Sequence, residues 1–140
     1  MHETEIISRV TKIVSNHKIG VLSTVENNQP HSRYMTFFLQ DLTLFTPTKK
    51  DTEKLAEIQK NPYVSILLGF AEKGSNDEYI ELKGVCTLNE TKEIKKKFWN
   101  DSFNSWFEGP NDPNYIFLEI KPETIRILNG EHMSTKEYKL

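Results

Sequence analysis

GVLSTVENNQPHSRYMTF, residues 20–37, decides the fold, because it sets two strand-like segments on either side of a turn. The first segment is rich in small and β-branched residues without a helical period, and the polar run 26–30 supplies turn chemistry before the second segment. The stretch therefore predicts a β-hairpin. Arg33 stands among large apolar residues in the second strand, and a cation on the wall of a core needs a counter-charge or a ligand.

The flanking sequence predicts an antiparallel sheet accompanied by helices. Apolar positions recur at helical spacing over residues 3–16, whereas the later apolar runs are short and bounded by turn residues. The predicted strands are 18–25, 31–39, 42–46, 63–70, 79–88, 115–120 and 124–128. A short helix is predicted between a cap at Asp51 or Thr52 and a stop at Asn61-Pro62. A second helix-prone run is predicted to begin after a cap at Asn89 or Thr91. Sequential short connections favour an α+β fold that is mainly β, an antiparallel barrel of six or seven strands with flanking helices.

Two local features refine this barrel. Gly84 falls in the middle of a strand, which predicts a bend or a close backbone approach. Lys121-Pro122 is expected to divide the last two strands, because proline cannot donate to a strand ladder. No repeat or linker interrupts the chain, so residues 1–140 are expected to form a single domain with 131–140 as a tail. Two alternatives stay open for the tail from Glu131 and for the polar loop 72–78: each covers the site or has no role in it.

The composition restricts the class of partner. The chain has 18 Lys and Arg against 20 Asp and Glu, a formal charge of −2, which provides no basic field for nucleic acid or an anionic membrane surface. A bound anion must therefore be held by a few placed groups. The single cysteine, Cys86, can form no internal disulfide, and no signal peptide or long apolar run is present, so a cytoplasmic location is expected.

Common catalytic signatures are missing from the sequence. The histidines His2, His17, His31 and His132 form no helical pair with metal-site spacing, so no metal is expected. The sequence has no nucleophile elbow, P-loop or dinucleotide fingerprint. The acidic residues are interpreted as lying on solvent-exposed faces of helices and loops. Spacing alone supports no particular catalytic class.

An ordered set of cationic, hydroxyl and aromatic residues remains. The set runs from Arg33 and Met35 on one strand, through Phe45 and Thr46 at the end of the next and Thr52 and Lys54 at a helix start, to Trp106 and Phe107 far downstream. Cations, hydroxyls and the free N–H groups of a first helical turn suit a phosphate. The aromatic residues suit a flat ring.

At these positions the chain resembles the general stress protein branch of the pyridoxamine 5′-phosphate oxidase-like, FMN-binding split-barrel superfamily. The resemblance covers residues 5–128 and rests on GVLSTVENNQPHSRYMTF, LTLFTPTKKDTEKLAEIQKNPYVSIL, YIELKGVCTL and FWNDSFNSWFEGPNDPNYIFLEIKPETIRIL. It implies an FMN-binding split barrel, a homodimer with the flavin site at the subunit interface, and flavin-dependent oxidoreductase chemistry.

The resemblance also implies which residues contact the cofactor. They are Arg33, Lys54 and Thr52 at the phosphate, Met35 and Thr36 along the ring edge, Phe45 and Thr46 at the ribityl chain and phosphate, and Trp106 as the residue of the second subunit that covers the ring. From the residues alone, these side chains equally suit packing, capping or solvent-exposed roles.

Departures from the oxidase proper narrow the implied activity. Phe38 and Glu53 stand where the oxidase carries basic residues, and its C-terminal Arg and His motif has no counterpart in residues 129–140. The resemblance therefore implies weaker phosphate binding and no vitamin B6 oxidation. Two alternatives stay open: a flavin-binding stress protein without catalysis, and a cofactor-free dimeric barrel. FAD or a deazaflavin is an alternative to FMN.

Overall fold

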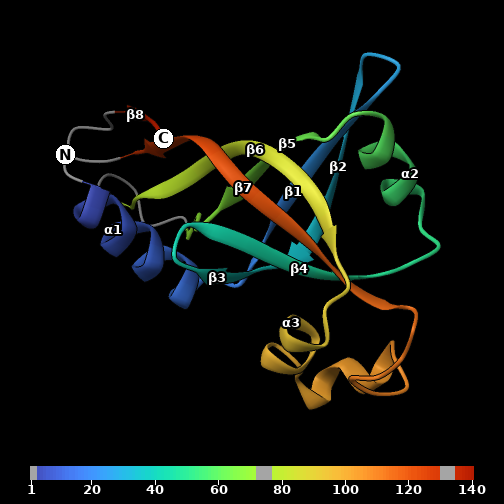
Figure 1. Cartoon of the computed structure of the whole chain (residues 1–140). Coiled ribbons are helices and arrows are strands. Elements are labelled where there is room, and N and C mark those ends of the chain that lie inside the picture. Colours follow the sequence, from blue (N-terminus) through green and yellow to red (C-terminus); the bar gives the residue numbers. More distant parts are fainter. Residues whose placement is uncertain (1–2, 72–76, 130–134) are drawn as a thin grey trace.

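The computed structural model describes residues 3–71, 77–129 and 135–140 and contains one curled antiparallel sheet (Figure 1). The strand order is β2-β1-β5-β6-β7-β4-β3, and β8 pairs with β7. The strands are β1 (Ile19–Glu26), β2 (Gln29–Thr36), β3 (Phe38–Gln40), β4 (Thr43–Lys49), β5 (Tyr63–Leu68), β6 (Tyr79–Asn89), β7 (Tyr115–Leu128) and β8 (Lys136–Lys139). The helices are α1 (Glu3–Asn16), α2 (Glu53–Lys60), α3 (Lys92–Lys97) and the short 3-10 helix η1 (Asp101–Ser105).

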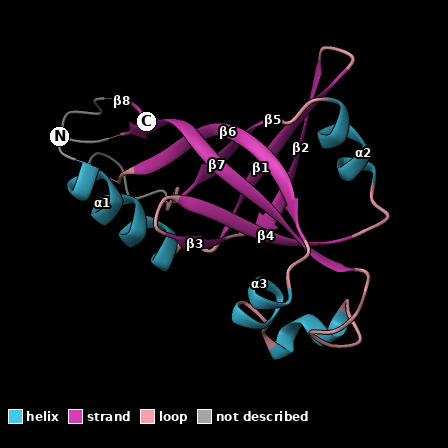
Figure 2. Ribbon diagram, in the orientation of Figure 1, coloured by secondary structure: helices cyan, strands magenta, loops and turns pink. Residues whose placement is uncertain are grey.

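The curl of the sheet makes a half-barrel with its core on the inner face. Alternate side chains of β1 point inward, and Leu22 is fully buried together with Ile66, Leu82 and Leu118 from the strands that follow. The apolar stripe of α1 joins this core and closes one end of the half-barrel, while α2 packs against β1 at the other end (Figure 2). The predicted split-barrel class is confirmed. No helix among the described residues is long and apolar enough to cross a membrane.

The prediction that Lys121-Pro122 divides two strands is wrong. One strand, β7, runs from Tyr115 to Leu128. Pro122 is tolerated because it lies where β7 changes partner from β4 to β8 and opposite Gly84, at a register shift in the β6–β7 ladder. The predicted close approach at Gly84 is confirmed, since a Cβ there would lie 2.2 Å from the carbonyl oxygen of Lys121.

The predictions for residues 31–39, for the strand 42–46 and for the tail also differ from the structure. The predicted strand 31–39 is broken at Phe37, whose N–H donates to the carbonyl of Lys18 instead of joining a ladder. The strand predicted to end at Thr46 continues to Lys49, because Pro47 is accommodated in a segment paired on one side only. Residues 136–139 of the predicted tail form β8. Residues 72–76 of the predicted loop and 131–134 of the tail lie outside the described residues.

Candidate functional site

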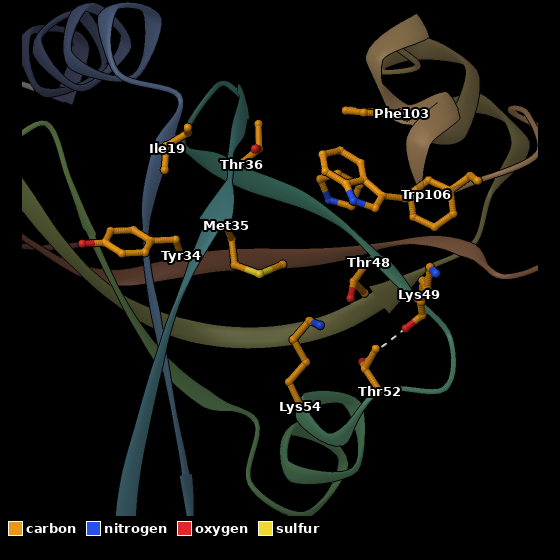
Figure 3. Close-up of a pocket in the computed structure, with 12 residues that line it drawn as sticks. Ile19, Tyr34, Met35, Thr36, Thr48, Lys49, Thr52, Lys54, Phe103 and Trp106 are labelled. Atoms are coloured by element: carbon orange, nitrogen blue, oxygen red, sulfur yellow. Dashed lines mark hydrogen bonds between the residues drawn. The ribbon is translucent and has the colours of Figure 1, made fainter.

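A pocket of about 400 Å³ lies at the split of the half-barrel, between β2 and β4 (Figure 3). This volume falls within the range of small-molecule sites. The lining residues come from β1, β2, β4, the start of α2 and the segment around η1: Ile19, Tyr34, Met35, Thr36, Pro47, Thr48, Lys49, Thr52, Lys54, Phe103, Trp106 and Phe107. The pocket is therefore assembled from segments far apart in the sequence.

Two open strand edges flank this pocket. Among the described strands, β2 is the last on one side of the sheet and pairs only with β1. Within the described part of the chain, β4 pairs with β3 through residues 43–45 only, so the edge of residues 46–49 that faces away from β7 has no described strand partner. An open edge presents unpaired backbone N–H and C=O groups. The pocket thus offers hydrogen-bonding groups from the main chain beside largely apolar side chains.

Lys54 provides the positive charge nearest the centre of the pocket. Its side chain rises from α2 toward Met35 and Thr48 and makes no ion pair or hydrogen bond with the described residues (Figure 3). Burial, and secondarily the charge of Arg33, lower the pKa of the Lys54 ammonium. The only other ionised side chain among the described lining residues is Lys49, and none of them carries a carboxylate or an imidazole. The electrostatics favour an anion.

Aromatic residues after α3 form the opposite wall. Phe103 and Phe107 are buried in an aromatic cluster around Tyr115, whose ring centroid lies 4.9 Å from that of Phe107. Asn100 caps η1 by accepting a hydrogen bond from the Ser102 N–H, which fixes the start of this segment. Trp106 follows η1, remains 60% exposed and points into the pocket (Figure 3). Its indole is available to a ligand because Phe103 and Phe107, and not Trp106, are buried in the aromatic cluster.

Arg33 has a protein counter-charge, which sequence reasoning did not find. Its Nη1 donates to the Thr24 hydroxyl at 2.8 Å, and its Nη2 lies 3.3 Å from Oε2 of Glu57. Glu57 is a helical residue with a side chain only 1% exposed, and His31 Nδ1 lies 3.0 Å from its other oxygen. The hydrogen bond from Thr24, aided by His31 and Arg33, lowers the pKa of the Glu57 carboxyl despite its burial.

The structure brings five of the eight predicted cofactor contacts together. Met35, Thr36, Thr52, Lys54 and Trp106 all line the pocket. Trp106 does so in its own chain, whereas the expected position was over the ring of a second subunit. The other three do not line it: Arg33 turns to Glu57, Phe45 packs in the aromatic cluster, and Thr46 is buried with a hydroxyl that has no hydrogen-bond partner among the described residues. The predicted Thr52 position is the N-cap of α2, but its hydroxyl donates to the carbonyl of Lys49 at 3.2 Å.

Two functional features lay beyond the sequence prediction. Thr48 lines the pocket on the same strand face as Thr46, and strand alternation extended through Pro47 would have found it. Glu57 gave no such signal, because an acidic residue in a short polar helix is ordinarily solvated. Its role depends on how α2 packs against β1.

The sequence and the fold that carry this pocket are matched by known proteins. The family model described as pyridoxamine 5′-phosphate oxidase matches residues 7–129, and the chain belongs to this family. General stress protein 26 of Bacillus subtilis (strain 168) is 46% identical over 130 residues, 93% of each chain.

Solved structures extend the comparison to the fold. General Stress Protein 26 from Bacillus anthracis str. Sterne superposes with a TM-score of 0.86 at 35% identity, covering 97% of this chain and 99% of that one. A pyridoxamine 5′-phosphate oxidase-related, FMN binding protein from Nostoc punctiforme PCC 73102 has a TM-score of 0.66 at 16% identity, covering 98% and 94%. At that identity the likeness concerns the fold alone.

Proposed function

We propose that this protein binds FMN in the pocket between β2 and β4 and acts as a flavin-dependent oxidoreductase of the cytoplasm. The observation that carries the proposal is the half-buried Lys54 ammonium, which has no partner among the described residues, in a pocket that also exposes the Trp106 indole. An anionic group at one end and a flat ring at the other satisfy both features. The family and the description of the Nostoc protein as FMN binding support the choice of flavin.

The residues present fit such a cofactor. An uncompensated ammonium in a partly buried position is unfavourable without an anion, and a phosphate supplies one. The open edges of β2 and β4 offer backbone groups for the polar rim of the ring. When bound, the flavin supplies two-electron redox chemistry.

Each part of the pocket then has its own task. Lys54 binds the phosphate, and Lys49 adds positive potential. The Thr52 hydroxyl lies in the same wall of the pocket. Arg33 acts chiefly through the charge it places beside Lys54, since its guanidinium is engaged by Glu57. Trp106 and Met35 exclude water from the ring, which strengthens the polar contacts nearby.

We also propose that a second copy of this chain completes the pocket. Ile19 and Tyr34 on the rim are 66% and 79% exposed, and the outer face of β1, β2 and β5 continues from them to Tyr63 and Leu67. Val21 pairs with both Tyr34 and Leu67 in the ladders, so these outward side chains form one apolar row. A partner seated on this face would cover the open side of the pocket.

The test compares FMN with riboflavin, which lacks the phosphate. Flavin-free protein is titrated with each ligand while tryptophan fluorescence and the visible spectrum are recorded, and dithionite is then added to the FMN complex. We expect micromolar FMN binding, weaker riboflavin binding and bleaching on reduction. Lys54→Met should weaken FMN at least tenfold, the effect of losing one charge-assisted hydrogen bond of about 1.5–3 kcal/mol, and leave riboflavin unchanged.

The matched control is Lys60→Met, which removes an exposed lysine from the other end of the same helix. Equal affinity for FMN and riboflavin, or equal loss in both lysine variants, would contradict the assignment of Lys54. Parallel titrations with FAD and a deazaflavin determine the cofactor. Binding without turnover of reduced nicotinamide would leave a flavin-binding protein and remove the oxidoreductase.

A further inference from the structure

A second polar cluster lies outside the pocket, where the β1–β2 hairpin meets α2 (Figure 1). It contains Glu26 at the end of β1, His31 on β2 and Glu57 on α2. One oxygen from each carboxylate and one imidazole nitrogen all lie within 4.8 Å of one another. The pocket does not use these three groups directly.

Strand alternation directs the two hairpin residues to the same side. Glu26 lies two residues after the buried Thr24 on one strand face, and His31 is the cross-strand partner of Thr24. α2 covers this face and brings Glu57 against it. Sequence reasoning could not find this group, because its members belong to three different elements.

The two oxygens of the Glu57 carboxylate lie in different environments. Oε2 accepts hydrogen bonds from Thr24 and Arg33. Oε1 is inaccessible to solvent and has no hydrogen bond from any described residue, although His31 Nδ1 lies 3.0 Å away. A buried carboxylate oxygen without a donor is costly. Oε1 therefore faces the cluster with the His31 imidazole as its only ion-pair partner among the described residues.

The spacing of Oε1 and Nδ1 suits a shared metal ion. A metal about 2.1 Å from both atoms and a ligand separation of 3.0 Å give a ligand–metal–ligand angle of about 90°. Such a metal lies off the line joining the two atoms, so the imidazole lone pair does not have to point at the oxygen. An angle of about 90° is that of neighbouring positions in an octahedron, which Mn²⁺ commonly adopts.

We propose that Glu26, His31 and Glu57 bind a divalent first-row transition-metal ion of the Mn²⁺ type, with water at the remaining positions. Two carboxylates and an imidazole are ligands that such ions accept, and three protein ligands leave open positions. The two carboxylate charges balance the dication, and Arg33 stays at the other oxygen of Glu57, Oε2. The metal would tie the β1–β2 hairpin to α2.

The test uses Mn²⁺ alone on flavin-free protein that has been treated with EDTA and desalted. Free aqueous Mn²⁺ gives a six-line paramagnetic resonance signal that weakens when the ion binds, so a titration yields both stoichiometry and affinity. We expect one ion per chain, and a rise in Tm that grows with Mn²⁺ concentration. Glu26→Gln and His31→Asn should each weaken binding at least tenfold, because each removes one ligand but leaves the Arg33–Glu57 pair intact.

The matched controls are Glu53→Gln and His17→Asn, which change the same residue types outside the cluster. Both should bind Mn²⁺ as the wild type does, and circular dichroism checks that all four variants are folded. Absence of Mn²⁺ binding by the wild type at millimolar concentration, or equal binding by ligand and control variants, would overturn the proposal. The FMN titration does not depend on this outcome.

Discussion

Arg33 is the residue whose role in the structure differs most from the role that the sequence indicates. An arginine in an apolar strand needs a counter-charge, and the sequence directed attention to a bound phosphate. The fold supplies a buried carboxylate, Glu57, instead. Arg33 is therefore balanced before any ligand arrives, whereas Lys54 is not.

The buried Arg33–Glu57 pair predicts a specific stability cost. Glu57→Gln removes the negative charge while keeping the side-chain shape, and leaves a guanidinium that is only 26% exposed without its counter-ion. We expect the free energy of unfolding to fall by about 2–3 kcal/mol, since breaking a fully buried pair costs about 3–5 kcal/mol. Urea denaturation measures this, with the exposed Glu53→Gln expected to be neutral; an unchanged midpoint would mean that Glu57 does not stabilise the charge of Arg33.

Lys54 predicts the opposite sign, a gain in stability on removal. Its pKa is lowered in the folded protein, so charging it opposes folding; this cost is complete below the lowered pKa and disappears as the pH rises toward the ordinary value of 10.5. At pH 7 the ligand-free Lys54→Met variant should melt higher than the wild type by about 2–5 °C. Differential scanning calorimetry against Lys60→Met provides the check, and an equal or lower Tm for Lys54→Met would contradict an unpaired ammonium in the pocket.

At the scale of elements, the β6–β7 ladder depends on one glycine. A Cβ on Gly84 would meet the Lys121 carbonyl oxygen at 2.2 Å and Pro122 Cα at 3.0 Å, and both contacts are backbone atoms that cannot rotate away. Gly84→Ala should therefore lower the free energy of unfolding by about 2–3 kcal/mol. Gly109→Ala is the control, because nothing lies within 4 Å of a Cβ there. Similar denaturation midpoints for the two variants would show that the ladder can shift to admit a methyl group.

The elements that sequence reasoning predicted well are those with a strong local pattern. The helix α1 follows from its apolar stripe, and the β1–β2 hairpin from a polar turn whose residues Asn27 and Asn28 adopt positive φ. The errors concern partners rather than patterns. Pro122 and Pro47 appear as breaks in the sequence, but each lies where a strand lacks a neighbour on one side or changes partner, which only the assembled sheet reveals.

The candidate site follows the same division. Lys54, Thr52, Met35 and Trp106 were named in advance because the resemblance aligns them by order along the chain, and they do meet in one pocket. The Glu57 network was invisible because its members are separated by up to 33 residues and have no common motif. Order along the chain identified residues on the pocket wall, whereas the charges behind that wall required the packing of α2 on β1.

At the scale of the whole molecule, the proposed dimer makes pocket occupancy depend on an outer sheet face. Leu67 lies on β5, is 40% exposed and is separated from Tyr34 on the pocket rim by Val21 alone in the ladder. A carboxylate at this position would be desolvated in an apolar interface, at a cost of several kcal/mol per buried copy. Leu67→Glu should therefore convert a dimer into a monomer at micromolar concentration, as measured by light scattering during gel filtration.

The Leu67→Glu variant also tests whether one chain alone forms a complete FMN pocket. If a partner covers the open side of the pocket, the Leu67→Glu monomer should bind FMN at least tenfold more weakly, although none of the described lining residues has changed. Ser15→Glu adds the same charge on an exposed position of α1 and should alter neither quantity. A Leu67→Glu monomer with unchanged FMN affinity would show that one chain suffices for the cofactor. A Leu67→Glu protein that stays dimeric would require a different interface, because two carboxylates cannot be buried against that apolar row without a counter-charge.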